Sequence, residues 1–172
     1  MHVLVASDGN LPIDTTVQFV TRLAGSDGEV TLYTVVEVPR TLLEDLRRAY
    51  EDIEPAPPVD TDAEYVSATS ATPHLAVGWP GDDTMITRYV DDVTERRLGP
   101  LRDALAAHGI EPSVVGEDAE DAARAILGAV DRLGADVLCI GARGLGRFEG
   151  LLGSTSTKLA RRAPCPVLII RD

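Results

Sequence analysis

Cysteine, histidine and lysine are all scarce in this chain of 172 residues. With two cysteines, Cys139 and Cys165, neither a disulfide framework nor a cysteine metal site has enough ligands, and we expect both to be buried thiols. The three histidines lie far apart in the sequence, which disfavours a metal cluster or a catalytic triad. No run approaches the roughly 20 apolar residues of a membrane span. The first residues also lack the basic start of a signal peptide, so we expect a cytoplasmic protein.

Positive charge is in deficit, with 16 basic against 28 acidic residues and a formal net charge of -12. This balance disfavours binding to nucleic acid or to anionic lipid. Lysine occurs once, at Lys158, while the other 15 basic residues are arginine, and aspartate outnumbers glutamate by 17 to 11. The pattern is typical of a high-salt cytoplasm, where dense surface charge is screened, and equally of a GC-rich coding bias.

What the sequence has in quantity is short apolar runs that alternate with amphipathic stretches. We predict five strands from these runs, at residues 2–6, 30–36, 112–115, 137–140 and 167–170. Helical periodicity is clear from Ile13 to Ala24 and from Ala123 to Leu133. Strands that are apolar on both faces and alternate with helices predict an α/β fold, a parallel sheet covered by helices on both sides.

Capping residues favour the same helices. Asn10 and Pro12 precede the first helix and Asp118 precedes the second, while Gly25 and Gly134 follow their last turns. A further helix is expected from about Ser154 to Arg162.

The middle of the chain is less regular. Residues from about 54 to 83 are rich in Pro, Asp, Ser and Thr, and we interpret them as a surface insertion within one domain that spans residues 1–172. A helix is expected to resume near Asp83 and to reach Leu105, with a kink or a split at Gly99-Pro100.

The first strand ends at Ala6-Ser7-Asp8-Gly9. In an open α/β sheet, ligands bind outside the carboxyl ends of the strands near the reversal of strand order. Asp8 is therefore a candidate to accept hydrogen bonds from a ribose or a base. The alternative is a turn or capping residue in an Asp-Gly turn.

The fourth strand leads into a glycine-rich segment, residues 141–153, followed by Ser154 and Thr155 at the start of a helix. Glycine lets backbone N–H groups approach an anion, and a helix N-terminus adds partial positive charge, so this segment is a candidate phosphate cradle. The alternative is a corner-turning loop with Ser154 as an ordinary N-cap. The segment matches neither a P-loop nor a dinucleotide fingerprint.

Three separated segments resemble the universal stress protein family. They are Val3-Leu4-Val5-Ala6-Ser7-Asp8-Gly9, then Gly141-x2-Gly144 with Gly153-Ser154-Thr155, and the closing Ala163-Pro164-Cys165-Pro166-Val167. The chain departs from the family's pattern in two places. Eight residues separate Gly144 from Gly153 where the pattern has nine, and Ala6-Ser7 replaces a pair that often contains proline.

The resemblance implies a Rossmann-like sheet in the order 3-2-1-4-5 that binds ATP or a related adenine nucleotide, with Mg²⁺ as a candidate companion. Asp8 would lie at the adenine and ribose end, and the backbone of Val35 would meet the adenine. The phosphate site would be formed by Gly141, Arg143, Gly144, Gly153, Ser154 and Thr155.

The glycine-rich segment and Asp8 favour nucleotide binding, and the resemblance implies a regulatory protein of the stress response. No general base, nucleophile or metal set accompanies the cradle, so we expect at most slow hydrolysis. The competing hypothesis is a protein-interaction module that binds no nucleotide and uses the insertion with Trp79, the only tryptophan. The last strand, Val167 to Ile170, is an apolar sheet edge, and we predict that it forms a homodimer interface.

Overall fold

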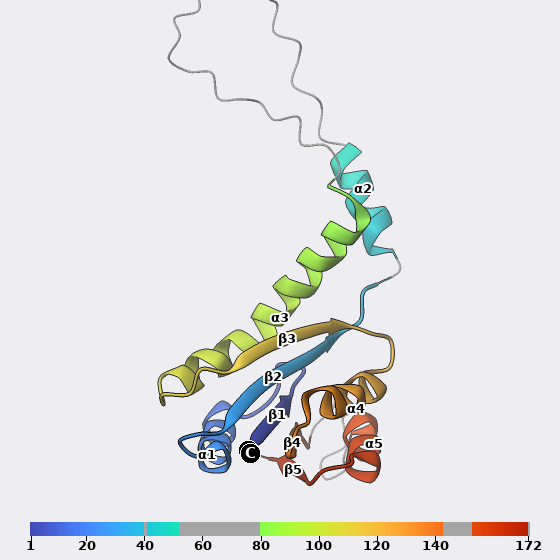
Figure 1. Cartoon of the computed structure of the whole chain (residues 1–172). Helices are drawn as coiled ribbons and strands as arrows, with labels where there is room; N and C mark the ends of the chain where they lie inside the picture. The colour runs from blue at the N-terminus through green and yellow to red at the C-terminus, as the bar shows by residue number, and fades with distance from the viewer. Residues whose placement is uncertain (40, 52–79, 143–152, 172) are drawn as a thin grey trace, which may run out of the picture. The chain divides into compact units, whose positions relative to one another are not determined.

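Five strands and five helices make up the part of the chain that the structure describes, residues 1–39, 41–51, 80–142 and 153–171 of a computed structural model (Figure 1). In chain order they are β1 (His2–Ala6), α1 (Ile13–Ala24), β2 (Glu29–Val36), α2 (Leu42–Glu51), α3 (Asp82–Ala106), β3 (Ser113–Asp118), α4 (Ala122–Leu133), β4 (Val137–Gly141), α5 (Ser154–Arg162) and β5 (Val167–Ile170). The chain divides into two compact units, Met1–Val38 with Arg88–Asp172, and Pro39–Thr87. The first unit contains the whole sheet.

All five strands run parallel, in the order β3-β2-β1-β4-β5. The central strand is β1, where Val3 is paired with Val30 of β2 on one side and with Val137 of β4 on the other. The chain builds outward from β1 to β3 and then returns to β4, so strand order reverses between β1 and β4. This topology confirms the predicted fold class and strand order.

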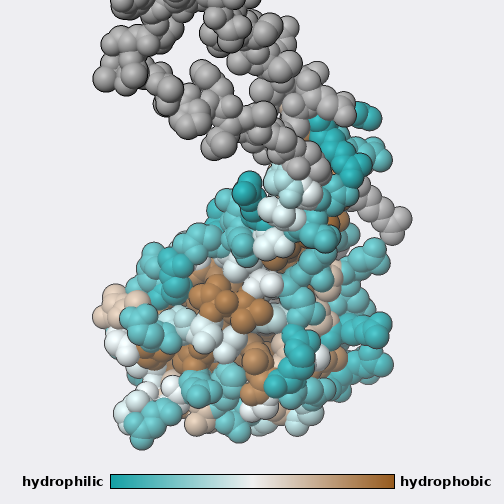
Figure 2. All heavy atoms as spheres, turned by 45° about the horizontal axis from the view of Figure 1, so that its top comes forward, coloured by the Kyte–Doolittle hydropathy of each residue, from teal (hydrophilic) through white to brown (hydrophobic). Residues whose placement is uncertain are grey.

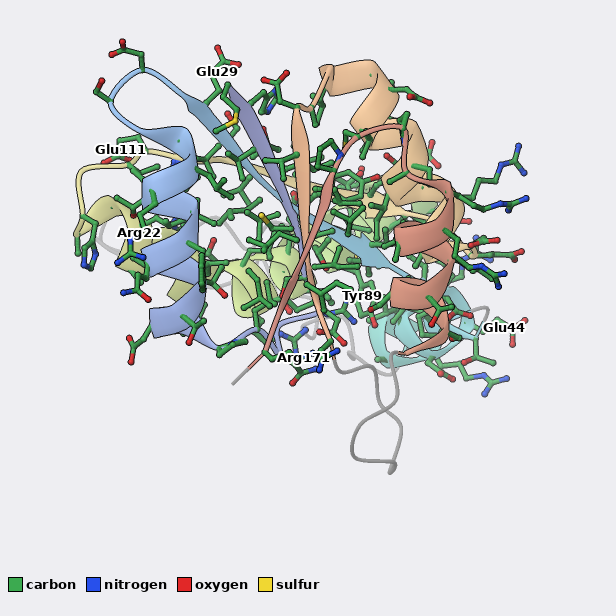
Figure 3. All side chains as sticks on the ribbon, turned by 90° about the horizontal axis from the view of Figure 1, so that it is seen from below. Arg22, Glu29, Glu44, Tyr89, Glu111 and Arg171 are labelled. Atoms are coloured by element: carbon green, nitrogen blue, oxygen red, sulfur yellow. The ribbon has the colours of Figure 1, made fainter. Side chains whose placement is uncertain are left out.

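Apolar side chains alternate between the two faces of the sheet, and each face packs against its own helices. On β1, Val3 and Val5 enter a core cluster with residues of α1 and α3, whereas Leu4 and Ala6 enter a second cluster with residues of α4 and α5. Figure 3 shows α1 and α5 on opposite sides of the strands. Burial on both faces explains why the strands are continuous apolar runs in the sequence.

The helix ends show which capping predictions were correct. Gly25 and Gly134 follow α1 and α4 with φ of 61° and 60°, as predicted, because glycine adopts positive φ without strain. The predicted cap at Asp118 was wrong, since β3 continues to this residue. Asp121 caps α4 instead, with its carboxylate accepting a hydrogen bond from the Arg124 amide at 3.1 Å.

We predicted a kink or a split at Gly99-Pro100. The helix α3 continues through Pro100, so the split was wrong, and the kink stays a prediction. Proline removes one backbone hydrogen bond from a helix interior. Pro100 is exposed, so the acceptor that loses this bond can turn to water, while Leu98 and Leu101 on the buried side stay in the core. Packing of the flanking leucines therefore outweighs the local cost of the proline.

The second unit contains α2, which periodicity in the sequence did not predict. It also contains the first turns of α3, and an ion pair joins Arg47 of α2 to Asp82 of α3. Residues 52–79, the bulk of the expected insertion, lie outside the described residues, so the interpretation as one domain with an insertion stays a prediction.

On the face shown in Figure 2, hydrophilic residues surround smaller hydrophobic patches. Among the described residues, the large apolar side chains that are exposed are Met1, Ile13, Phe19 and Leu133. No helix in the described ranges has the length and apolar character needed to cross a bilayer.

Candidate functional site

A cavity of about 330 Å³ opens where strand order reverses, at the carboxyl ends of β1, β2 and β4. The start of α5 and the first turns of α4 complete its wall. Its lining consists of Ala6, Ser7, Asp8, Asn10, Leu11, Tyr33, Val35, Ala122, Ile126, Ile140, Gly141, Gly153, Ser154, Thr155, Ser156 and Leu159. The cavity therefore lies at the position where open α/β sheets bind ligands.

Most of the residues singled out from the sequence line this cavity. They are Asp8, Val35, Gly141, Gly153, Ser154 and Thr155. Arg143 and Gly144 lie outside the described residues. Segments 145 residues apart in the chain thus meet at one site, because the ends of β1 and β4 are neighbours in the sheet.

Asp8 lies in the turn between β1 and α1. One carboxylate oxygen, Oδ1, accepts a hydrogen bond from the Asn10 amide at 3.2 Å, and Gly9 follows with φ of 96°. This is the local turn geometry that the sequence left open as an alternative. Among the described residues, none donates to Oδ2, so the same side chain serves the turn and leaves one oxygen for a ligand.

The N-terminus of α5 forms the polar end of the cavity. Gly153 is the N-cap and makes no side-chain cap bond, so Ser154 is the first helical residue and its interpretation as an N-cap was wrong. The first helical hydrogen bond runs from the Thr157 amide to the Gly153 carbonyl at 2.8 Å. The amides before it have no intrahelical partner. No acidic residue lies in this first turn, so its partial positive charge is not neutralised there.

The residues on either side of the glycine-rich segment, its two stems at 141–142 and 153–156, are hydrogen-bonded to each other. The Gly153 amide donates to the Ala142 carbonyl at 3.4 Å, and the hydroxyl of Ser156 donates to the Gly141 carbonyl at 2.8 Å. Ser156 is buried, and sequence reasoning missed it as a site residue. The place of α5 relative to β4 is therefore set by the stems rather than by the length of the segment between them.

The apolar end of the cavity is built around Tyr33, which sequence reasoning also missed. Its side chain is fully buried, and its hydroxyl donates to Oε2 of Glu117 at 2.6 Å. The Arg132 guanidinium donates to the same oxygen at 2.6 Å. Because the ring is fully buried and its hydroxyl is bound to Glu117 outside the cavity lining, Tyr33 supports this end from behind, and the half-buried side chain of Val35 supplies apolar surface there.

These bonds shift the titration of both groups. Burial, with the Glu117 bond as a second cause, raises the pKa of Tyr33 well above its ordinary value. Hydrogen bonds from Tyr33 and then from Arg132 lower the pKa of Glu117. Tyr33 therefore stays neutral and Glu117 stays ionised at neutral pH.

Arg97 of α3 is a third residue that the sequence did not single out. Its Nη1 donates to the Val35 carbonyl at 2.8 Å and lies 3.3 Å from Oγ1 of Thr34. The helix lies close to β3 at this level, since a Cβ at Gly116 would clash with Thr94, one turn before Arg97. If the Val35 backbone contacts a base, as expected, its carbonyl does so while it accepts a hydrogen bond from the Arg97 guanidinium.

In the described ranges, no three His, Cys, Asp or Glu side chains come together as a group that could hold a metal ion. Of the two cysteines, Cys139 is buried and Cys165 is half-buried, so the expectation of two buried thiols was correct for the first only. Burial raises the pKa of Cys139 to about 12, which makes its thiol unreactive at neutral pH.

Residues 1–171 match the model of the universal stress protein family. The chain belongs to this family. A universal stress protein of Thermus aquaticus is 36% identical over 97 residues, which is 54% of this chain and 71% of that protein. A universal stress protein of Mycobacterium tuberculosis is 46% identical over 39 residues, 22% of this chain. That alignment spans only 14% of the M. tuberculosis protein.

Solved structures of universal stress proteins share the fold at low sequence identity. A family protein of Arabidopsis thaliana with AMP bound has a TM-score of 0.56 at 17% identity, covering 99% of this chain and 90% of its own. The protein of Archaeoglobus fulgidus in complex with dAMP has a TM-score of 0.52 at 17% identity, covering 99% and 98%. These neighbours show that the fold can hold adenine nucleotides.

Proposed function

We propose that this universal stress protein binds ATP or a related adenine nucleotide in the cavity between the ends of β1 and β4. The observation that carries the proposal is the combination, in one cavity, of the unpaired amides of Ser154 and Thr155 in α5 with apolar lining residues such as Val35 and Ile126. Phosphates need the first and a base needs the second. Neighbours of the same fold that hold AMP and dAMP support the choice of an adenine nucleotide.

In this proposal the nucleotide lies across the reversal of strand order. Ser154 and Thr155 donate to the phosphates, and Gly153, whose amide is bound to the Ala142 carbonyl, allows the phosphates to approach the backbone closely. Gly141 lies at the strand end, and Arg143 and Gly144 are contributed by the glycine-rich segment. The free oxygen of Asp8 accepts from the ribose, and the base lies against Val35, above the buried ring of Tyr33. Any Mg²⁺ would enter with the phosphates and be held chiefly by their oxygens.

We assign a regulatory role in the stress response of the cytoplasm, with at most slow hydrolysis of the nucleotide. In the described part of the cavity Asp8 is the one carboxylate, and one of its oxygens is engaged in the turn. Hydrolysis needs a positioned base or metal to activate water. The competing hypothesis of a protein-interaction module rests on Trp79 and on the number of residues between Gly144 and Gly153. Trp79 and residues 144–152 lie outside the described residues.

We further propose a homodimer through β5. This strand is a sheet edge, and Val167, Leu168 and Ile169 are only half-buried in the isolated chain. An unpaired apolar edge is a site for pairing with another strand. Sedimentation equilibrium at micromolar concentration in molar salt tests this proposal, and a monomer mass would contradict it.

Titration calorimetry with ATP, ADP, AMP and adenosine, each with and without Mg²⁺ and at low and molar salt, tests the nucleotide proposal. We expect binding with affinity that rises with the number of phosphates, because each phosphate adds contacts to the α5 end. Ser154→Ala should weaken the binding of ATP more than the binding of adenosine. Ser113 is an exposed serine at the start of β3, and Ser113→Ala should change neither affinity. No heat at millimolar nucleotide under any condition would overturn the proposal.

A further inference from the structure

The carbonyl of Val35 points toward the cavity's base end. In a parallel strand, successive residues direct their backbone groups to alternate neighbours. The Tyr33 carbonyl accepts from the Ser7 amide of the β1 side at 3.0 Å, and the Val36 carbonyl accepts from the Ala119 amide of the β3 side at 3.2 Å. Val35 therefore faces the β1 side, but β1 has ended at Ala6, so its carbonyl extends past the strand end where the cavity lies.

This carbonyl already has a partner. Arg97 Nη1 donates to it at 2.8 Å, and Arg97 lies so near the turn that carries Asp8 that a Cβ added at Gly9 would be 3.3 Å from the Arg97 Cγ. Among the described residues, no carboxylate lies within ion-pair distance of Arg97, and Nη1 is the only guanidinium nitrogen with a protein acceptor. A cation with unused N–H donors is thus hydrogen-bonded to Val35, a residue of the cavity lining, although Arg97 itself is not one of the lining residues.

Purine bases differ in the group that they present there. Adenine carries an amino group at position 6, which donates, whereas hypoxanthine and guanine carry an oxygen, which accepts. A free backbone carbonyl favours the amino group. A carbonyl that already accepts from a guanidinium forms a weaker hydrogen bond with the amino group of adenine. The remaining guanidinium donors favour the oxygen of hypoxanthine or guanine.

We propose that Arg97 is a specificity-determining residue that removes the preference of this cavity for 6-amino over 6-oxo purine nucleotides. The inference rests on the proposed nucleotide binding and deepens it. The substrate class is accordingly a purine nucleotide, adenine or hypoxanthine, bound with similar affinity.

The test compares AMP with IMP, which differ at position 6 of the base and in the proton on the adjacent ring nitrogen. Calorimetry on the wild type should give Kd values within about threefold of each other. In Arg97→Met, which retains an unbranched stem against Gly9, the Val35 carbonyl is released. The ratio of the IMP Kd to the AMP Kd should then rise about three- to tenfold, the effect of one neutral hydrogen bond. Arg96→Met, which removes the neighbouring arginine that pairs with Asp92 on the helix surface, should leave the ratio unchanged.

A second measurement needs no variant. Purine riboside 5′-monophosphate has only hydrogen at position 6, and the wild type should bind it as tightly as AMP. Binding of AMP ten times tighter than this analogue, or an equal loss of AMP and IMP affinity in Arg97→Met, would overturn the inference while leaving the proposed function intact. If neither protein bound any of the three nucleotides, the proposed function would fail and the inference with it.

Discussion

The two ends of the cavity differ in the groups that form them: backbone amides at one end and side chains at the other. At the α5 end, backbone amides face the cavity and the side chain that matters, Ser156, acts by holding the helix to β4. At the β2 end, the backbone is covered or braced by side chains: Tyr33 bound to Glu117, and Arg97 bound to Val35. The amides of the first end can bind any anion, whereas the second end depends on particular side chains. We therefore expect the α5 end to provide most of the affinity and the β2 end to provide discrimination.

The largest effect is expected from breaking the α5 end directly. Gly153→Val places a branched side chain at the N-cap, where the phosphates need close approach to the backbone. ATP affinity should fall by about a hundredfold or more, the loss of two or more charge-assisted hydrogen bonds. Adenosine should lose far less, because its contacts lie at the β2 end. An equal loss for ATP and adenosine in calorimetry would contradict the division between the two ends.

A smaller effect should follow from removing the hydrogen bond that holds α5 to the end of β4. Ser156→Ala removes the 2.8 Å bond to the Gly141 carbonyl and leaves that acceptor without this partner. We expect ATP affinity to fall by about tenfold and the free energy of unfolding by about 1 kcal/mol. Ser156→Thr keeps the hydroxyl and should restore the ATP affinity. If Ser156→Ala changed the stability but not the ratio of ATP to adenosine affinity, the hydroxyl would have no role in positioning α5.

The smallest effect sharpens the comparison from the other end. Tyr33→Phe retains the ring, so adenosine affinity should stay within about twofold, but it removes the main cause of the lowered pKa of Glu117. A lowered carboxyl pKa stabilises the fold above the ordinary value of 4.5, and this contribution is lost as the pH falls through the native pKa. The variant should be less stable by about 1 kcal/mol at pH 7.

Urea unfolding at pH 7 and at pH values below 4.5 measures this difference between wild type and Tyr33→Phe, which should shrink at the acid end. Tyr89→Phe is the matched control, since the structure gives the Tyr89 hydroxyl no partner among the described residues. A difference that stayed constant with pH would show that the Tyr33 hydroxyl is not coupled to ionised Glu117.

The residues found from the sequence share one property: their signal is local. Gly25 and Gly134 follow periodic helices, and Asp8 follows an apolar strand directly. By contrast, Tyr33 and Glu117 are 84 positions apart, and Arg97 and Val35 are 62 apart. Nothing near Arg97 in the sequence distinguishes it from Arg96. Such pairs depend on how α3 and β3 pack, which periodicity does not specify.

Errors at element ends have a related cause. Asp118 and Asp121 are both acceptable caps for α4, and the length of β3 decides between them. That length follows from pairing with β2, where Val36 is opposite Asp118. Local sequence rules can identify both candidate caps, but the pairing of β3 with β2 decides which one is used.

The tied stems of the glycine-rich segment bear on how this family can be engineered. Because Ala142 and Gly153 are hydrogen-bonded to each other and Ser156 holds α5 to β4, residues 143–152 begin and finish at neighbouring points. A replacement segment must close the same short gap whatever its length, and each doubling of loop length costs only about 0.6 kcal/mol. We therefore expect that segments of other lengths can be grafted between these two residues while the sheet and its helices stay as they are.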